Sequence, residues 1–296
     1  MKVLRTPDDR FLHLPGYDFE PHYVEVSDLR MHYVDAGPAH ADPVLLLHGE
    51  PSWSYLYRKM IPPLANAGHR VIAPDLIGFG KSDKPASQGD YSYASHVDWM
   101  RRFVEALDLT GITLFCQDWG SLIGLRVAAG HQHRFARIAL GNGGMPTGDE
   151  IFPRAFRIWR AFAKWSPWFP IGRIIQSGTI NELSKEEVAA YNAPFPSRQY
   201  KAGTRAFPTL VPTDPDNVAS EDNRRAWDML SRFEKPFLTT FSNRDPITRG
   251  GERPFQERVP GAKNQPHTKI RNAGHFLQED KGEELAEILI SFIETS

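Results

Sequence analysis

The sequence predicts an α/β protein with a mostly parallel, doubly wound sheet of about eight strands, interrupted by an inserted helical segment. Two observations support this prediction. Short apolar runs that suit buried strands alternate with longer segments whose apolar residues recur at helical spacing. In addition, the stretch from about Gly144 to Pro215 is rich in Trp, Phe, Arg and Pro and contains no run that resembles a strand.

The composition is that of an ordinary globular protein. The 296 residues are 41% hydrophobic and 24% charged, with a net charge of −1. This balance predicts no binding to nucleic acid or to a membrane. We find neither the apolar segment of a signal peptide nor an apolar run long enough to span a bilayer, so we expect a cytoplasmic protein. Cys116 is the only cysteine, which excludes an internal disulfide and a multi-cysteine metal site.

The first strands are predicted from alternation and from continuous apolar runs. Residues 23–26 and 31–35 alternate apolar with polar side chains and suit a β-hairpin. The run that begins at Pro43 is continuously apolar, as in a strand buried on both faces, and ends at His48-Gly49-Glu50-Pro51. Glycine and proline in that loop would let the peptide N–H of Glu50 point into a cavity at the carboxyl end of the strand.

The next strand is predicted over residues 69–75, and a crossover helix over residues 93–109. The loop between them contains Gly80-Lys81-Ser82, which is similar to the end of a phosphate-binding loop. That pattern also requires a glycine at the position of Asp75, so we interpret this segment as a structural loop.

An abrupt change from strand to helix is predicted at Asp118. Residues 112–116 are apolar except for Thr113, and after Gln117-Asp118-Trp119-Gly120 the apolar residues recur at helical spacing. A tight strand-to-helix turn that holds one side chain above a sheet is the nucleophile elbow, usually written G-x-S-x-G, here with Asp in place of Ser. The alternative interpretation is an ordinary strand end where Asp118 caps the helix.

Two more titratable side chains follow later strands. Asp245 comes after the strand predicted over residues 237–242, and His275 follows a short edge strand at residues 268–271. The order Asp118, Asp245, His275 is the nucleophile, acid, histidine order of the α/β-hydrolase fold. Taken singly, Asp245 suits a turn before proline and His275 suits the surface. Taken together at strand ends, the three residues predict a catalytic site.

The chain resembles the haloalkane dehalogenases over nearly its full length. The matching motifs are His48–Arg58, Cys116–Gly120, Asn272–Phe276 and, in the insertion, Phe156–Trp159 and Ala190–Pro196. They are most similar to the branch that has two tryptophan halide ligands and a catalytic acid after the seventh strand. The other branch places its acid after the sixth strand, where this chain has Asn142, which cannot serve as a carboxylate.

The resemblance implies a role for each site residue. Asp118 would be the nucleophile, His275 the general base, Asp245 the catalytic acid, Trp119 and Trp159 the halide ligands, and Glu50 and Trp119 the oxyanion-hole donors. The Glu50 side chain would also help to hold the hydrolytic water. Trp165 and Trp168 lie close in sequence and are alternatives to Trp159 as the second halide ligand.

The chemistry explains why these residue types are needed. An aspartate side chain is anionic at neutral pH, so it can attack a saturated carbon without a base. The product is an ester, which water activated by a neutral histidine can hydrolyse, whereas a serine would form a stable ether. Indole N–H groups can donate to a departing halide, since they add no competing base. We expect no cofactor and no metal, and the partners to be a small haloalkane, water and a halide ion.

The same interpretation predicts the domain organisation. Residues 1–144 and 216–296 would form the α/β-hydrolase core and residues 145–215 a helical cap, in a chain of monomeric size. Three other functions are considered. An epoxide hydrolase would need two cap tyrosines, for which Tyr191 and Tyr200 are available, but Glu50 fits that family poorly. A serine esterase is excluded because Ser121 lies away from the elbow position, and a non-catalytic binding protein would be expected to have lost a catalytic residue.

Overall fold

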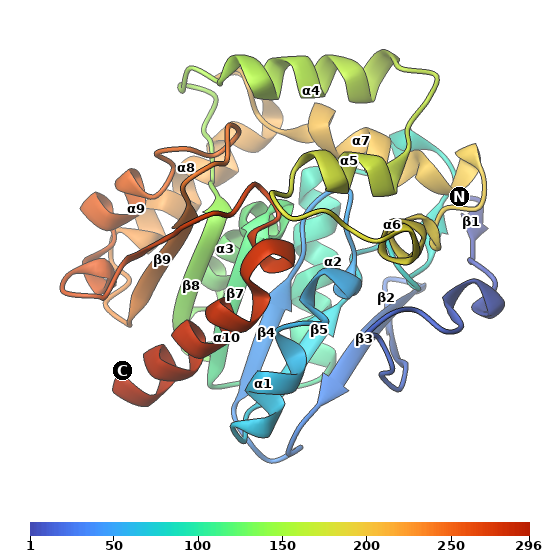
Figure 1. Ribbon diagram of the computed structural model, residues 1–296. Helices are drawn as coiled ribbons and strands as arrows, with labels where there is room; N and C mark the ends of the chain where they lie inside the picture. The colour runs from blue at the N-terminus through green and yellow to red at the C-terminus, as the bar shows by residue number, and fades with distance from the viewer.

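An eight-stranded, mostly parallel sheet runs through the middle of the molecule, in the strand order β10-β9-β8-β7-β4-β5-β3-β2 (Figure 1). The computed structural model describes residues 1–296. The strands are β2 His22–Val26, β3 Leu29–Ala36, β4 Pro43–Leu47, β5 Arg70–Pro74, β7 Ile112–Asp118, β8 Phe135–Gly143, β9 Phe237–Ser242 and β10 Thr268–Ile270. Six neighbouring strands pair in parallel, namely β10, β9, β8, β7, β4 and β5. Strands β2 and β3 pair antiparallel as the predicted hairpin. A separate two-stranded ladder joins β1 Val3–Leu4 to β6 Lys84–Pro85. The predicted α/β fold with about eight strands is therefore confirmed.

Helices cover the sheet on both faces. These helices are α1 Ile61–Asn66, α2 Tyr93–Ala106, α3 Trp119–Gly130, α8 Val218–Leu230, α9 Arg253–Arg258 and α10 Leu277–Thr295. Helix α10 packs with α1, and α3 packs with α2 and α8. Helix α2 begins after Ser92, whose side chain accepts a hydrogen bond from the Ser95 amide in a capping box. None of the helices combines the length and the apolar composition that a bilayer-spanning helix requires.

Between β8 and β9 the chain forms α8 and, before it, four inserted helices. They are α4 Arg154–Trp165, α5 Ile171–Ser177, α6 Lys185–Asn192 and α7 Ala202–Leu210. In Figure 1 they lie above the sheet, at the end toward which the parallel strands run. Helix α4 is amphipathic, since Phe156 and Ala163 are buried while Arg157 and Ile158 are exposed. The inserted helices therefore cover the edge of the sheet where α/β proteins bind their ligands.

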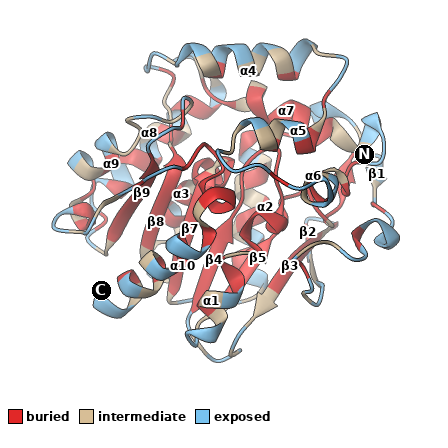
Figure 2. Ribbon diagram, in the orientation of Figure 1, coloured by how far each residue is buried: buried red, intermediate tan, exposed pale blue.

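The central strands β4 and β9 are buried on both faces (Figure 2), and for β4 the continuous apolar sequence predicts this burial. The loop after β5 is fixed by Asp75, which accepts hydrogen bonds from the amides of Ser54 (2.8 Å) and Lys81 (2.7 Å). The hydroxyl of Ser82 donates to the Asp75 carbonyl at 2.6 Å. These internal contacts agree with the interpretation of residues 78–83 as a structural loop, and they connect it to the chain that follows His48-Gly49-Glu50-Pro51.

Candidate active site

The turn from β7 to α3 holds Asp118 in an unusual backbone conformation. Its φ of 50° and ψ of −127° lie in a region that non-glycine residues rarely occupy, which costs about 1 to 3 kcal/mol. The turn is tight because a Cβ at Gly120 would collide with the Leu47 carbonyl, and one at Gly124 would press on the side chains of Leu47 and Leu114. The predicted elbow is therefore present, with helix α3 packed directly against β4 and β7.

The Asp118 side chain does not cap the helix. It makes no hydrogen bond to the first turn of α3, so the helix-cap interpretation is wrong. Instead Oδ1 accepts a hydrogen bond of 2.7 Å from the peptide N–H of Glu50, and Oδ2 lies 3.5 Å from Nε2 of His275. A Cβ at Gly49 would collide with the Asp118 carboxylate, which explains the glycine before Glu50.

Asp245 holds the other side of the imidazole. Its Oδ2 lies 3.0 Å from Nδ1 of His275 and also accepts hydrogen bonds from the hydroxyl and the amide of Thr248. The amide of Ile247 donates to Oδ1 at 2.8 Å. Burial favours a higher pKa for Asp245, but His275 and these donors outweigh burial and lower the pKa below its ordinary value. Asp245 therefore stays ionised and fixes Nδ1 of His275 as the protonated nitrogen.

His275 lies between two carboxylates. Burial favours a lower pKa, but the charges of Asp245 and Asp118 and their hydrogen bonds to the ring outweigh burial and raise the pKa to about 10. The protonated ring is therefore favoured at pH 7 while Asp118 carries its charge, whereas the neutral His275 expected from the sequence belongs to the ester stage. Loss of that charge would remove one of the two causes of the high pKa.

The backbone around His275 is held by two amide side chains that the sequence analysis did not assign to this role. Asn142 donates from Nδ2 to the carbonyls of Gly274 (2.9 Å) and His275 (3.0 Å), and Gln117 donates from Nε2 to the His275 carbonyl at 3.2 Å. Asn142 and Gln117 both lie near the carboxyl ends of central strands. Their position near strand ends could have indicated a place in the site, but only the fold shows which backbone carbonyls they contact.

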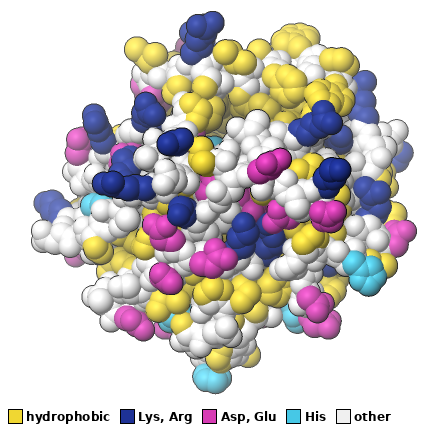
Figure 3. Space-filling model, in the orientation of Figure 1, with side chains coloured by type: hydrophobic (Ala, Val, Ile, Leu, Met, Phe, Trp, Pro, Cys, Tyr) yellow, Lys and Arg dark blue, Asp and Glu magenta, His cyan; other side chains and the backbone are white.

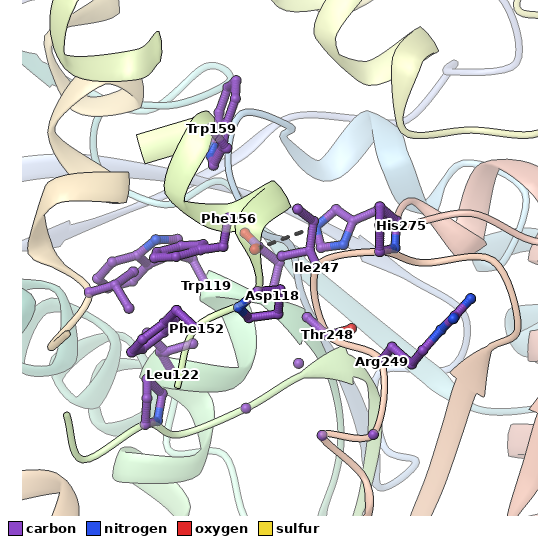
Figure 4. A pocket seen from close by; sticks show the side chains of 18 of the residues that line it. Asp118, Trp119, Leu122, Phe152, Phe156, Trp159, Ile247, Thr248, Arg249 and His275 are labelled. Carbon is purple, nitrogen blue, oxygen red and sulfur yellow. Dashed lines mark ion pairs between the residues drawn. The ribbon is translucent and has the colours of Figure 1, made fainter. Parts of the chain in front are cut away.

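One large cavity brings the predicted site residues together. It has a volume of about 860 Å³ and is lined by Glu50, Asp118, Trp119, Trp159 and His275 among others. In Figure 4 Asp118 lies between His275 on one side and a group of apolar side chains on the other. This group contains Trp119, Leu122, Phe152 and Phe156. The cavity therefore offers an apolar ligand a direct approach to the Asp118 carboxylate.

The tryptophans differ in their positions. Trp119 is buried, stacks on Phe207 with ring centroids 4.4 Å apart, and lines the cavity together with Trp159. Neither of these indole N–H groups donates to a protein acceptor. Trp165 and Trp168 are 75% and 59% exposed and do not line this cavity. Apolar side chains gather over α4 at the top of Figure 3, on the outer surface of the inserted helices. The structure therefore brings Trp159 to the cavity and leaves the two alternatives outside it.

The carboxyl group of Glu50 is almost completely buried at the cavity wall. Its Oε1 has no hydrogen-bond partner among the protein atoms. Burial and the charge of Asp118 raise the pKa of Glu50 well above its ordinary value. This shift favours the protonated form of the carboxyl group, which can both donate and accept a hydrogen bond.

The side chains required by the alternative functions lie elsewhere. The hydroxyl of Tyr191 donates to Glu279, that of Tyr200 to the Arg5 carbonyl at 3.4 Å, and neither residue lines the cavity. Ser121 donates to the Asp118 carbonyl at 2.5 Å, so its hydroxyl is bound inside the elbow. The arrangement can attack an apolar electrophile with a carboxylate, but it offers neither the tyrosine pair of an epoxide hydrolase nor a serine nucleophile.

Comparison with known proteins finds similar chains over nearly the full length. The family model of the α/β hydrolase fold matches residues 42–282. A haloalkane dehalogenase of Psychrobacter cryohalolentis is 59% identical, with 99% of this chain and 98% of that protein covered. One from Mycobacterium marinum is 56% identical over 99% of this chain and 100% of that protein. The tetrameric structure of the haloalkane dehalogenase DpaA from Paraglaciecola agarilytica is 37% identical, with a TM-score of 0.89 and 97% of each chain covered.

Proposed function

The chain belongs to the haloalkane dehalogenases, hydrolases that act on carbon–halogen bonds, and we propose that Asp118 performs the first step of this reaction. Its Oδ1 is held by the Glu50 amide, which leaves Oδ2 as the attacking oxygen. A C–O bond forms between Oδ2 and the substrate carbon while the C–halogen bond breaks, and the halide leaves with the bonding electrons. The product is an alkyl ester on Asp118.

The departing halide is bound by the indole N–H groups of Trp119 and Trp159 in this proposal. Both side chains line the cavity and have no protein acceptor for their N–H groups. A hydrogen bond to a charged group contributes about 1.5 to 3 kcal/mol. If both bonds form mainly as the charge develops, they accelerate the step by about two to four orders of magnitude.

Hydrolysis of the ester needs neutral His275. Formation of the ester removes the negative charge of Asp118, and with it one of the groups that hold the imidazole protonated. The neutral ring then accepts a proton from water, and the hydroxide attacks the carbonyl carbon of the ester. Asp245 stabilises the imidazolium that results. The alkyl C–O bond is kept, the acyl C–O bond breaks, and the alcohol leaves with a proton.

The proposed oxyanion hole consists of the peptide N–H groups of Glu50 and Trp119. The Glu50 amide already contacts Oδ1, the ester carbonyl oxygen in this scheme, and Trp119 is the first residue of α3, where a peptide N–H has no acceptor within the helix. The buried Glu50 carboxyl group would bind the hydrolytic water, which would supply the missing partner of Oε1.

One observation carries the proposal above all others. In a single apolar cavity, the two oxygens of the same Asp118 carboxylate face the Glu50 amide and the His275 ring. A serine hydrolase would not place an anion at this position, and an epoxide hydrolase would need tyrosines in the cavity.

Isotope labelling tests the proposal directly. With enzyme in excess over a bromoalkane in ¹⁸O water, a single turnover should give unlabelled alcohol, because the alcohol oxygen comes from Asp118. The label should appear in the Asp118 carboxylate. Labelled alcohol and an unlabelled protein would show direct attack by water and would contradict the proposal. A panel of chloro- and bromoalkanes, with styrene oxide as the epoxide control, would compare the two substrate classes through halide and diol release.

The organisation of the chain is a further part of the proposal. We assign residues 1–144 and 216–296 to the core and residues 145–215 to the cap, supported by the run of helices α4 to α7 without a strand. We keep the monomer as the proposed state, although DpaA is described as a tetramer. Light scattering should give a mass near 33.5 kDa, and about four times that mass would contradict the monomer. The cytoplasmic location stays a prediction.

A further inference from the structure

We infer that Asp280 is a positioning residue, which fixes the position of the general base His275 relative to the cap wall of the substrate cavity. The inference rests on the proposed function of His275. Asp280 lies in the first turn of α10, four residues after Phe276, and its side chain is buried. It is not one of the residues that the reaction scheme uses.

The Asp280 carboxylate accepts hydrogen bonds from two separate segments. Oδ2 accepts from the amide of Gly274, the residue directly before His275, at 2.8 Å. Oδ1 accepts from the amides of Ile180 (2.9 Å) and Asn181 (2.8 Å) in the loop after α5. One anion therefore fixes three peptide N–H groups, and charge-assisted hydrogen bonds of this kind are stronger than neutral ones.

The two segments also contact each other directly. The amide of Phe276 donates to the Gly178 carbonyl at 3.2 Å. A Cβ at Gly274 would collide with that carbonyl, and a Cβ at Gly178 would collide with the Phe276 ring. The seam between the His275 loop and the cap loop is thus too tight for side chains at these two glycines, and Asp280 is the charged group that closes it.

Both segments reach the cavity. Gly178, Thr179 and Ile180 line the cavity on one side of the seam, and Gly274, His275 and Phe276 line it on the other. On the core side, Asn142 and Gln117 already bind the carbonyls of the His275 loop. The contacts on the cap side are those of Asp280 and Gly178. Without the carboxylate, the His275 loop would keep its contacts with Asn142 and Gln117, but the position of the imidazole relative to the cap wall would no longer be fixed.

The proposed positioning role predicts which chemical step depends on Asp280. Attack by Asp118 needs only the elbow and the halide ligands, whereas hydrolysis also needs a precisely placed imidazole. A displacement of about 1 Å in a catalytic group can slow a step by about 100-fold. Loss of the carboxylate should therefore slow hydrolysis selectively, so that the alkyl ester on Asp118 accumulates.

The test compares Asp280→Ala with wild type in rapid-mixing experiments. We expect alkylation, measured as the first equivalent of halide, within about threefold of wild type, and hydrolysis about 10- to 100-fold slower. Mass spectrometry should find most of the variant as the alkyl ester. Because the halide has left before hydrolysis, kcat for a chloroalkane and for its bromo analogue should become equal. Equal slowing of both steps would show a general structural role, and no change in either step would also overturn the inference.

Two further variants keep the test decisive. Asp280→Asn retains the size and one acceptor oxygen, so we expect a smaller defect, again confined to hydrolysis, and this variant decides the matter if Asp280→Ala does not fold. Tyr191→Phe is the matched control, since Tyr191 donates to the neighbouring Glu279 across the same core–cap interface without contacting the His275 loop. It should leave the ratio of the two rates unchanged, and a shift equal to that of Asp280→Ala would overturn the inference. If His275→Phe fails to accumulate an ester, the proposed function fails instead.

Discussion

Removal of the Asp118 carboxylate should lower the pKa of His275 by about 2 to 3 units. In the unreacted protein this pKa is raised to about 10, because the carboxylates of Asp245 and Asp118 together outweigh burial, which favours the neutral ring. Asp118→Ala leaves the contact with Asp245 in place and removes only the second anion. It therefore reproduces the loss of charge that the ester intermediate would undergo.

The size of the effect follows from the distance between the two groups. Oδ2 of Asp118 lies 3.5 Å from Nε2 of His275. At an effective dielectric constant of about 20, two unit charges at this distance attract by about 5 kcal/mol, which corresponds to a pKa difference of about 3.5. Water in the cavity screens part of this attraction. A downward shift of this size would make His275 a better base at neutral pH once the ester has formed.

Nuclear magnetic resonance of protein with labelled histidine measures this pKa directly. Asp222→Ala is the matched control, because it also removes one carboxylate, paired with Arg126 at 2.7 Å away from the catalytic site. That control should leave the His275 pKa unchanged. A wild-type pKa near 6.5, or a shift below half a unit in Asp118→Ala, would refute the proposed switch of the base.

The same shift has a consequence for stability. A folded-state pKa above the unfolded value of 6.5 stabilises the fold, with the full contribution present below pH 6.5 and lost as the pH rises through about 10. The stability that wild type gains over Asp118→Ala from this ion pair should therefore disappear above pH 10. Urea unfolding at a series of pH values measures the difference.

Three further results are expected. Trp159→Phe should weaken bromide binding about 10- to 150-fold, from the loss of one charged hydrogen bond, whereas Trp165→Phe should leave it unchanged; fluorescence titration with bromide distinguishes the two variants. Asn142→Leu should lower the free energy of unfolding by about 2 to 4 kcal/mol, because buried carbonyls lose their donors, and urea denaturation with an unchanged midpoint would contradict this role. Iodoacetamide should leave the native enzyme active, since burial raises the pKa of Cys116 and makes the thiol unreactive; rapid inactivation would argue for an accessible thiol.

The sheet could be predicted because its strands have local sequence signals. A continuous apolar run predicted β4, alternation predicted the hairpin of β2 and β3, and the edge position of β10 followed from its short length. Strand β8 begins at Phe135, three residues before its apolar residues Ile138–Leu140. Its first residues pair with β7, and such pairing depends on a distant partner rather than on local pattern.

The parts of the site that could not be predicted depend on distance in space. Trp159, Trp165 and Trp168 have similar sequence surroundings, and only the packing of the inserted helices shows that Trp159 lines the cavity. The protonation of His275 depends on two carboxylates that are 157 and 30 residues away in sequence. Asp280 resembles any acidic residue in a first helical turn until its three amide donors are known.

The most direct test of the mechanism is to trap the covalent intermediate. Purified His275→Phe, mixed with 1-bromobutane, should release one equivalent of bromide and gain the mass of a butyl group, which peptide analysis should locate on Asp118. Protein of unchanged mass with no bromide release, or a butyl group on any residue other than Asp118, would contradict the assignment of this carboxylate as the nucleophile.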